Sequence, residues 1–128
     1  MNNKGIKLNF VIICDNAFLT KGTNLLNVIG IFDKIGAPKF PAIHSRFVVV
    51  TNVSGDPGEY EQMIVVKSKE ADKKIAELSG KLEINESGQK AQFIGNFLNV
   101  EFPIPGEYIV EIYIDGKKQT MKTNFFIT

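Results

Sequence analysis

The sequence predicts an all-β protein, an antiparallel β-sandwich of seven to eight strands, and three features lead to this prediction. Isoleucine, valine and phenylalanine are abundant, and β-branched and aromatic side chains favour strands. Short apolar stretches recur between turn signals at a spacing of about 10 to 15 residues, which is typical of sandwiches. No segment has the regular apolar stripe of a helix. The 128 residues contain no linker or repeat, so we expect one domain, 1–128.

The first two strands are expected at residues 8–14 and 25–35. The segment between them begins with Asp-Asn and ends with Lys-Gly followed by polar residues, which indicates a loop over residues 15–22. Gly30 interrupts the second strand. A glycine inside a strand indicates a bulge or a close approach of another group to the backbone.

Residues 36–41 are expected to form a crossing loop, because their two prolines lack the N–H that a strand ladder needs. A third strand follows at residues 46–53. The Ser-Gly-Asp-Pro-Gly segment at 54–58 ends it and is the strongest turn signal in the chain. The remaining strands are expected at residues 60–66, 75–84, 91–102, 108–114 and 121–127.

Short connections join these later strands. Residues 67–74 are densely charged and lack an apolar stripe, which favours a charged hairpin over a helix. Asp115-Gly116 is a hairpin signal. Tyr108 follows a Pro-Gly pair at the start of a late strand, where sandwich folds often place a structural corner tyrosine.

Three stretches of sequence carry a resemblance to a known family. They are LNFVIICDNAF at 8–18, NVIGIFDKIGAPKFPA at 27–42 and FPIPGEYIVEIYIDG at 102–116. In this order they resemble an uncharacterised bacterial family of small, single-domain β-sandwich proteins. The resemblance implies an immunoglobulin-like sandwich, and it implies no activity, cofactor or catalytic residue.

Composition argues against several classes of protein. The net charge is +1, with fourteen lysines and one arginine, and nucleic-acid binding usually needs a concentrated basic surface. One cysteine and one histidine cannot build a disulfide framework or a Cys/His zinc site. No apolar run approaches the length of a membrane span, and the five-residue run at 10–14 is too short for a signal peptide. We therefore expect a cytoplasmic protein without nucleic-acid or membrane partners.

The candidate site with the most chemistry is a loop end carrying Asp15, Asn16, Asp33 and His44. Oxygen ligands of this kind suit a hard cation, and the lone histidine could serve a small ligand or, with lower expectation, a reaction. The alternative is structural. Asp15 and Asn16 would form an Asx turn, and His44 would make a hydrogen bond at the edge of a loop.

Other reactive side chains favour structural roles. Cys14 ends an apolar strand without a cationic neighbour, so a core position is expected. Glu59 and Glu61 share a strand face at a separation resembling that of glycosidase carboxylates, but the absence of tryptophan favours a solvated strand. We assign no catalytic, cofactor-binding or metal-binding residue, and we expect no cofactor.

Three strands are apolar on both faces, at residues 10–13, 28–32 and 47–50. If they share a sheet, their outer side forms an apolar patch that needs a cover. The cover could be a segment of the same chain, 17–19 or 37–43, or another subunit. We expect a homodimer or another protein as the partner, and hence a non-enzymatic interaction or structural module.

Overall fold

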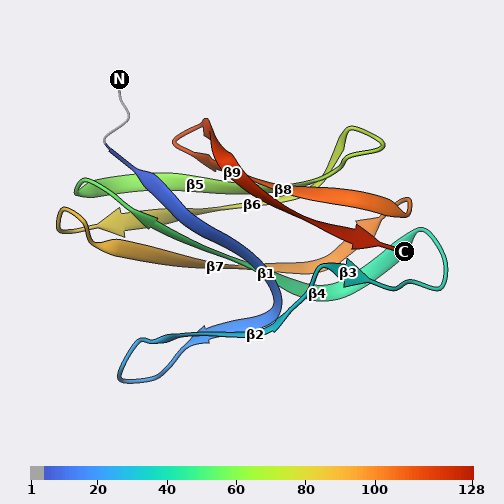
Figure 1. Ribbon diagram of the computed structural model, residues 1–128, viewed down its shortest axis with the longest axis horizontal. Coiled ribbons are helices and arrows are strands. Elements are labelled where there is room, and N and C mark those ends of the chain that lie inside the picture. The colour runs from blue at the N-terminus through green and yellow to red at the C-terminus, as the bar shows by residue number, and fades with distance from the viewer. Residues whose placement is uncertain (1–4) are drawn as a thin grey trace.

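The structure is a computed structural model that describes residues 5–128. Two packed β-sheets make up the molecule (Figure 1). All regular structure in these residues is β, as predicted. The strands are β1 (Lys7–Leu19), β2 (Leu26–Ile31), β3 (Lys34–Ile35), β4 (Ala42–Ser54), β5 (Gly58–Ser68), β6 (Lys73–Ile84), β7 (Lys90–Phe102), β8 (Gly106–Ile114) and β9 (Lys117–Ile127).

One sheet has the strand order β2-β1-β4-β7, and the other has the order β3-β9-β8-β5-β6. Neighbouring strands are antiparallel except β3 and β9, which pair in parallel. The expected count of seven to eight strands is wrong, because the segment predicted as one strand at 25–35 forms two. The chain leaves the first sheet after Ile31 and joins the second at Lys34.

The main core lies between the sheets and is centred on aromatic rings. Phe47 and Phe97 stack with centroids 5.0 Å apart, and Phe102 meets Tyr108 edge to face at 4.9 Å. Phe125 packs against both Phe102 and Tyr108. Residues of both sheets therefore share one buried cluster. Replacing a phenylalanine in such a cluster by alanine typically lowers the free energy of unfolding by about 3–5 kcal/mol.

A second, smaller apolar cluster covers the outer side of β1 and β4, two of the strands that are apolar on both faces, while Ile29 and Ile31 of β2 are exposed. Cys14, Ala17, Val48 and Val50 are buried in it, and side chains of β2 pack against it. The expected loop at 15–22 is wrong in part, because β1 continues to Leu19 and pairs with β2 as a ribbon. The ribbon of the same chain thus supplies the cover that was expected from a partner.

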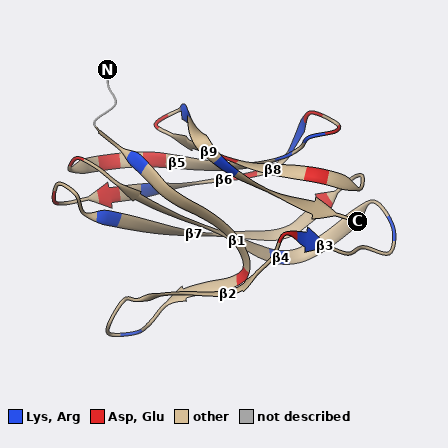
Figure 2. Ribbon diagram, viewed as in Figure 1, with Lys and Arg blue, Asp and Glu red and all other residues tan. Residues whose placement is uncertain are grey.

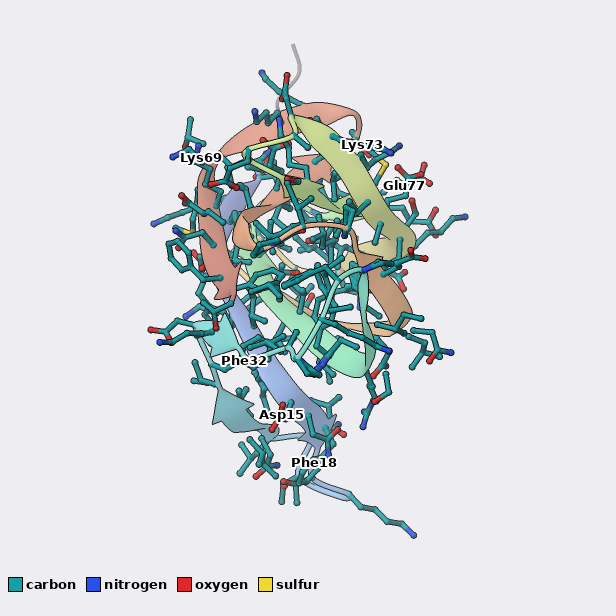
Figure 3. All side chains as sticks on the ribbon, turned by 90° about the vertical axis from the view of Figure 1, so that its right-hand side faces the viewer. Asp15, Phe18, Phe32, Lys69, Lys73 and Glu77 are labelled. Carbon is teal, nitrogen blue, oxygen red and sulfur yellow. The ribbon has the colours of Figure 1, made fainter. Side chains whose placement is uncertain are left out.

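The ribbon itself extends from the body at the end away from residue 5, as two views agree (Figures 1 and 3). Gly30 has a positive φ of 73°, and a Cβ there would lie 2.8 Å from a carboxylate oxygen of Asp15. The expectation of a bulge or close approach at Gly30 is confirmed. Only glycine combines this φ with the close approach of Asp15.

The corner tyrosine is also confirmed. Tyr108 is fully buried, and its hydroxyl donates a 2.5 Å hydrogen bond to the carbonyl oxygen of Ile104, four residues upstream. The densely charged segment between β5 and β6 is a hairpin, as expected.

Candidate functional site

Asp15 and Asn16 lie within strand β1 and do not form the expected Asx turn. The Asp15 side chain is exposed and lies against Gly30. The Asn16 side-chain oxygen accepts a 2.8 Å hydrogen bond from Arg46 of β4. Both residues therefore serve the bend of the ribbon. The turn was expected because this dipeptide usually ends a strand, but here pairing with β2 carries the strand onward.

Asp33 lies in the link between β2 and β3, and its carbonyl oxygen accepts a 2.9 Å hydrogen bond from the Phe126 N–H. It lines a shallow hollow beside Lys34, Phe126 and Thr128, which does not include His44. The four residues of the predicted loop end are thus divided among separate places. Within residues 5–128 no group of three or more His, Cys, Asp or Glu side chains could hold a metal ion.

His44 lines a pocket at one end of the sandwich, which we call the end pocket. Its volume is about 210 Å³. Phe102 and Ile127, both buried, form its floor. The other lining residues are Ile35, Gly36, Ala37, Pro38, Lys39, Pro41, Ala42 and Ile43.

The pocket forms where the chain crosses between the two sheets. The crossing loop at 36–41 starts from β3 in one sheet and returns to β4 in the other. Backbone hydrogen bonds fix its first part to the C-terminal end of β9: the Ala37 N–H donates to the Thr128 carbonyl at 2.9 Å, and the Thr128 N–H donates to Ile35 at 3.0 Å. The rest of the loop, which includes two prolines, spans the gap without joining a ladder.

The backbone is irregular where β7 runs beside His44. Asn99 has a positive φ of 52°, and both Phe97 and Val100 are buried although three positions separate them. The register between β4 and β7 is the same on both sides of this point, so the two strands change their alternation together. His44 pairs with Val100, and its ring lies 6.2 Å from that of Phe47, centroid to centroid.

The polar side chains of the end pocket make no hydrogen bond or ion pair with residues 5–128. The His44 ring, half-buried, makes no hydrogen bond with any part of residues 5–128. The expected hydrogen bond of His44 at a loop edge is therefore wrong. Lys39 is exposed at the rim and forms no ion pair with another described residue, and no acidic side chain lines the pocket. The pocket combines an apolar floor with an unpaired cation and an unpaired imidazole.

The outer face of the five-stranded sheet holds the other notable polar cluster. Glu111 is buried there, with Lys118 Nζ at 3.0 Å and Lys67 Nζ at 3.9 Å. The hydrogen bond to Glu111 raises the pKa of Lys118. Both basic and acidic positions fall along the strands and hairpins of this sheet (Figure 2). Because each charge near Glu111 lies beside an opposite one, we assign the cluster a structural role.

Cys14 and the paired glutamates lie where the structural interpretation put them. Cys14 is fully buried, and burial raises the pKa of its thiol, so little thiolate is available for chemistry. Glu59 and Glu61 are both exposed on β5. Across the ladder Glu59 faces Glu83 and Glu61 faces Lys81, on an open sheet surface.

Sequence reasoning found His44 but missed Lys39 and the floor of the pocket. Two prolines that bracket Lys39 were read as loop formers only, yet they also hold this lysine at the rim. The floor residues Phe102 and Ile127 are the last residues of β7 and β9. These strands belong to different sheets, so the two residues come together only when the sheets pack.

Comparison with solved structures shows a similar fold in a longer protein. A chain of the Pseudomonas fluorescens alkylpurine DNA glycosylase AlkC, bound to DNA containing an abasic site analog, matches with a TM-score of 0.61 and 11% identity. The match covers 99% of the present chain and 31% of that chain, so this chain spans about a third of its length. At this identity the likeness concerns the fold. A search of curated proteins found no match.

These findings correct the expected partners. A homodimer or protein partner without nucleic acid was expected, but the matching fold belongs to a chain that is bound to DNA. The reason for expecting a second subunit fails for β4, because the outer apolar side of that strand packs against the β1–β2 ribbon, whereas Ile29 and Ile31 of β2 are exposed. No helix among residues 5–128 is long and apolar enough to cross a membrane. Residues 9–126 match the model of a family of unknown function (DUF6941), and this chain belongs to that family.

Proposed function

We propose that this chain is a non-enzymatic binding module whose end pocket holds a small ligand. The observation that carries the proposal is the pair of polar side chains, His44 and Lys39, that line an apolar pocket and make no hydrogen bond or ion pair with residues 5–128. A few polar groups that converge on an apolar hollow are typical of ligand sites, and the half-buried His44 ring would gain a hydrogen bond there.

The same pocket supports binding over catalysis. A histidine that acts as a general base needs a nucleophile or water to activate and usually an acidic group to orient it. No serine, threonine, cysteine or acidic residue is among the lining residues. His44 can therefore donate or accept a hydrogen bond, but nothing beside it completes a catalytic arrangement.

The strand order supports an immunoglobulin-like assignment as part of the proposal. β1, β4 and β7 correspond in order to strands A, B and E of that class, and β5, β8 and β9 to strands C, F and G. The corner hydrogen bond of Tyr108 lies at the start of β8, where that class has its conserved tyrosine. A cytoplasmic location, suggested by the sequence, also belongs to the proposal.

A fragment screen with NMR detection tests the proposal. His44 is the sole histidine, so its imidazole signals need no assignment by mutagenesis. We expect some small, largely apolar fragments to shift these signals saturably, together with methyl signals of Ile43 and Ile127. If no fragment at millimolar concentration shifts the His44 signals, the end pocket is not a binding site.

The non-enzymatic part needs a separate measurement. We expect wild-type protein and the His44→Ala variant to give the same slow background hydrolysis of an activated ester such as p-nitrophenyl acetate. Hydrolysis by wild type that exceeds the variant by tenfold or more, with saturation, would overturn it.

A further inference from the structure

The chemistry of the end pocket also specifies a class of ligand, an inference that rests on the proposed function. We infer that the pocket takes a small carboxylic acid with an apolar body, whose carboxylate lies between Lys39 and His44. The charge, the hydrogen-bonding groups and the size of the pocket each favour such a ligand.

The charge of the pocket selects an anion. Lys39 is the one charged residue among those that line it. Four lysines of residues 5–128 lie within 4.0 Å of a carboxylate, among them Lys118 and Lys67 at Glu111, and Lys39 is not one of the four. A lysine left without a carboxylate beside an apolar hollow attracts an anionic group, and it repels a cationic one.

Hydrogen bonding favours a carboxylate among anions. The His44 ring offers one N–H donor when neutral and two when protonated, and neither nitrogen is used within the described chain. A carboxylate accepts from an imidazole and an ammonium group at once, because each oxygen has free lone pairs. A phosphate usually draws on several donors or an arginine, and the lining residues include no arginine.

The size and walls of the pocket set the remainder of the ligand. A volume of about 210 Å³ is below the ~300 Å³ at which pockets for drug-sized ligands begin. Phe102 and Ile127 at the floor and Ile35 and Ala37 on the walls favour an aromatic ring or a branched aliphatic chain. An acid of benzoate size therefore fits this description.

Matched probes test the carboxylate directly. Benzoate and benzamide share a ring and nearly the same shape but differ in charge. We expect benzoate to shift the His44 signals with a Kd of about 1 mM, as befits so small a ligand, and benzamide to bind about tenfold more weakly. The Lys39→Gln variant should lose about tenfold in benzoate affinity and leave benzamide unchanged.

The control variant is Lys21→Gln, which removes an exposed lysine from the turn between β1 and β2 and keeps the net charge equal to that of Lys39→Gln. It should bind benzoate as wild type does. If both probes bind the wild type equally, or if both lysine variants lose benzoate equally, the carboxylate assignment is wrong while the proposed pocket stands. If neither probe nor any other fragment shifts the His44 signals, the proposed function itself fails.

Discussion

The two ends of the sandwich treat their polar groups differently. At the end formed by the turns at 54–57, 85–89 and 115–116, side chains close the turns. Tyr60 donates a 2.7 Å hydrogen bond to the Asp56 carbonyl, and the Asp115 carboxylate accepts one of 2.9 Å from the Glu61 N–H. At the other end the 103–105 turn is closed in the same way by Tyr108, but in the crossing loop and beside it Lys39 and His44 have no such partners among residues 5–128. The contrast teaches that the turns use their polar side chains for stability, while the end pocket keeps two of them available to a ligand.

The largest expected effect on stability comes from the floor of the end pocket. Replacing Phe102 by alanine removes a fully buried ring that contacts Phe47, Tyr108 and Phe125. We expect the free energy of unfolding to fall by about 3–5 kcal/mol, measured by urea denaturation. A loss below about 1 kcal/mol would mean that the pocket extends into the core and has no packed floor.

A smaller effect on stability is expected at the opposite end of the sandwich, in the turn between β4 and β5. Replacing Tyr60 by phenylalanine removes the hydroxyl that bonds to Asp56 and keeps the buried ring. The free energy of unfolding should fall by about 1 kcal/mol, the usual net value of one hydrogen bond. An unchanged urea midpoint would show that this turn does not depend on the tyrosine.

The same tyrosine gives a dependence on pH. Burial, and next the charge of Asp56, raise the pKa of Tyr60 above its ordinary value near 10. The folded state then holds the phenolic proton more tightly than the unfolded state. The stability gained is complete below about pH 10 and is lost as the pH rises beyond it.

Stability of wild type and Tyr60→Phe should therefore be compared between pH 8 and pH 11. We expect the wild type to lose more stability than the variant over this range. Because lysines titrate in both proteins, only the difference between them reports on Tyr60. Parallel curves would contradict the raised pKa.

The smallest effect on stability is expected for the two polar side chains of the end pocket in the absence of ligand. His44→Gln and Lys39→Gln remove side chains that bond to nothing in the described chain. We expect each to change the free energy of unfolding by less than about 0.5 kcal/mol, measured by thermal and urea denaturation. A loss of 1 kcal/mol or more would show that these groups stabilise the fold and would remove the contrast between the ends.

Local sequence signals predicted much of the fold. Short apolar stretches between turn signals located most strands, and the Pro-Gly pair before Tyr108 predicted its corner. The failures lie where long-range pairing decides. Nothing local shows that residues 34–35 pair with β9, or that β1 continues through Asp15 because β2 pairs with it.

The candidate site was harder to predict, because three distant segments build it. His44 was singled out by composition, being the sole histidine, and it does line the end pocket. Asp15, Asn16 and Asp33 were grouped with it on the assumption of a shared loop end, and the bent ribbon separates them. The irregular backbone at Asn99, close to the partner of His44 in β7, has no clear signal in the sequence.

A crystal structure of the protein soaked in benzoate tests the central claim most directly. Our account predicts density for the ring over Phe102 and Ile127, with the carboxylate within about 3 Å of Lys39 Nζ and a ring nitrogen of His44. Benzoate bound elsewhere while the pocket holds only water, or a ring bound with its carboxylate pointing away from both side chains, would contradict it.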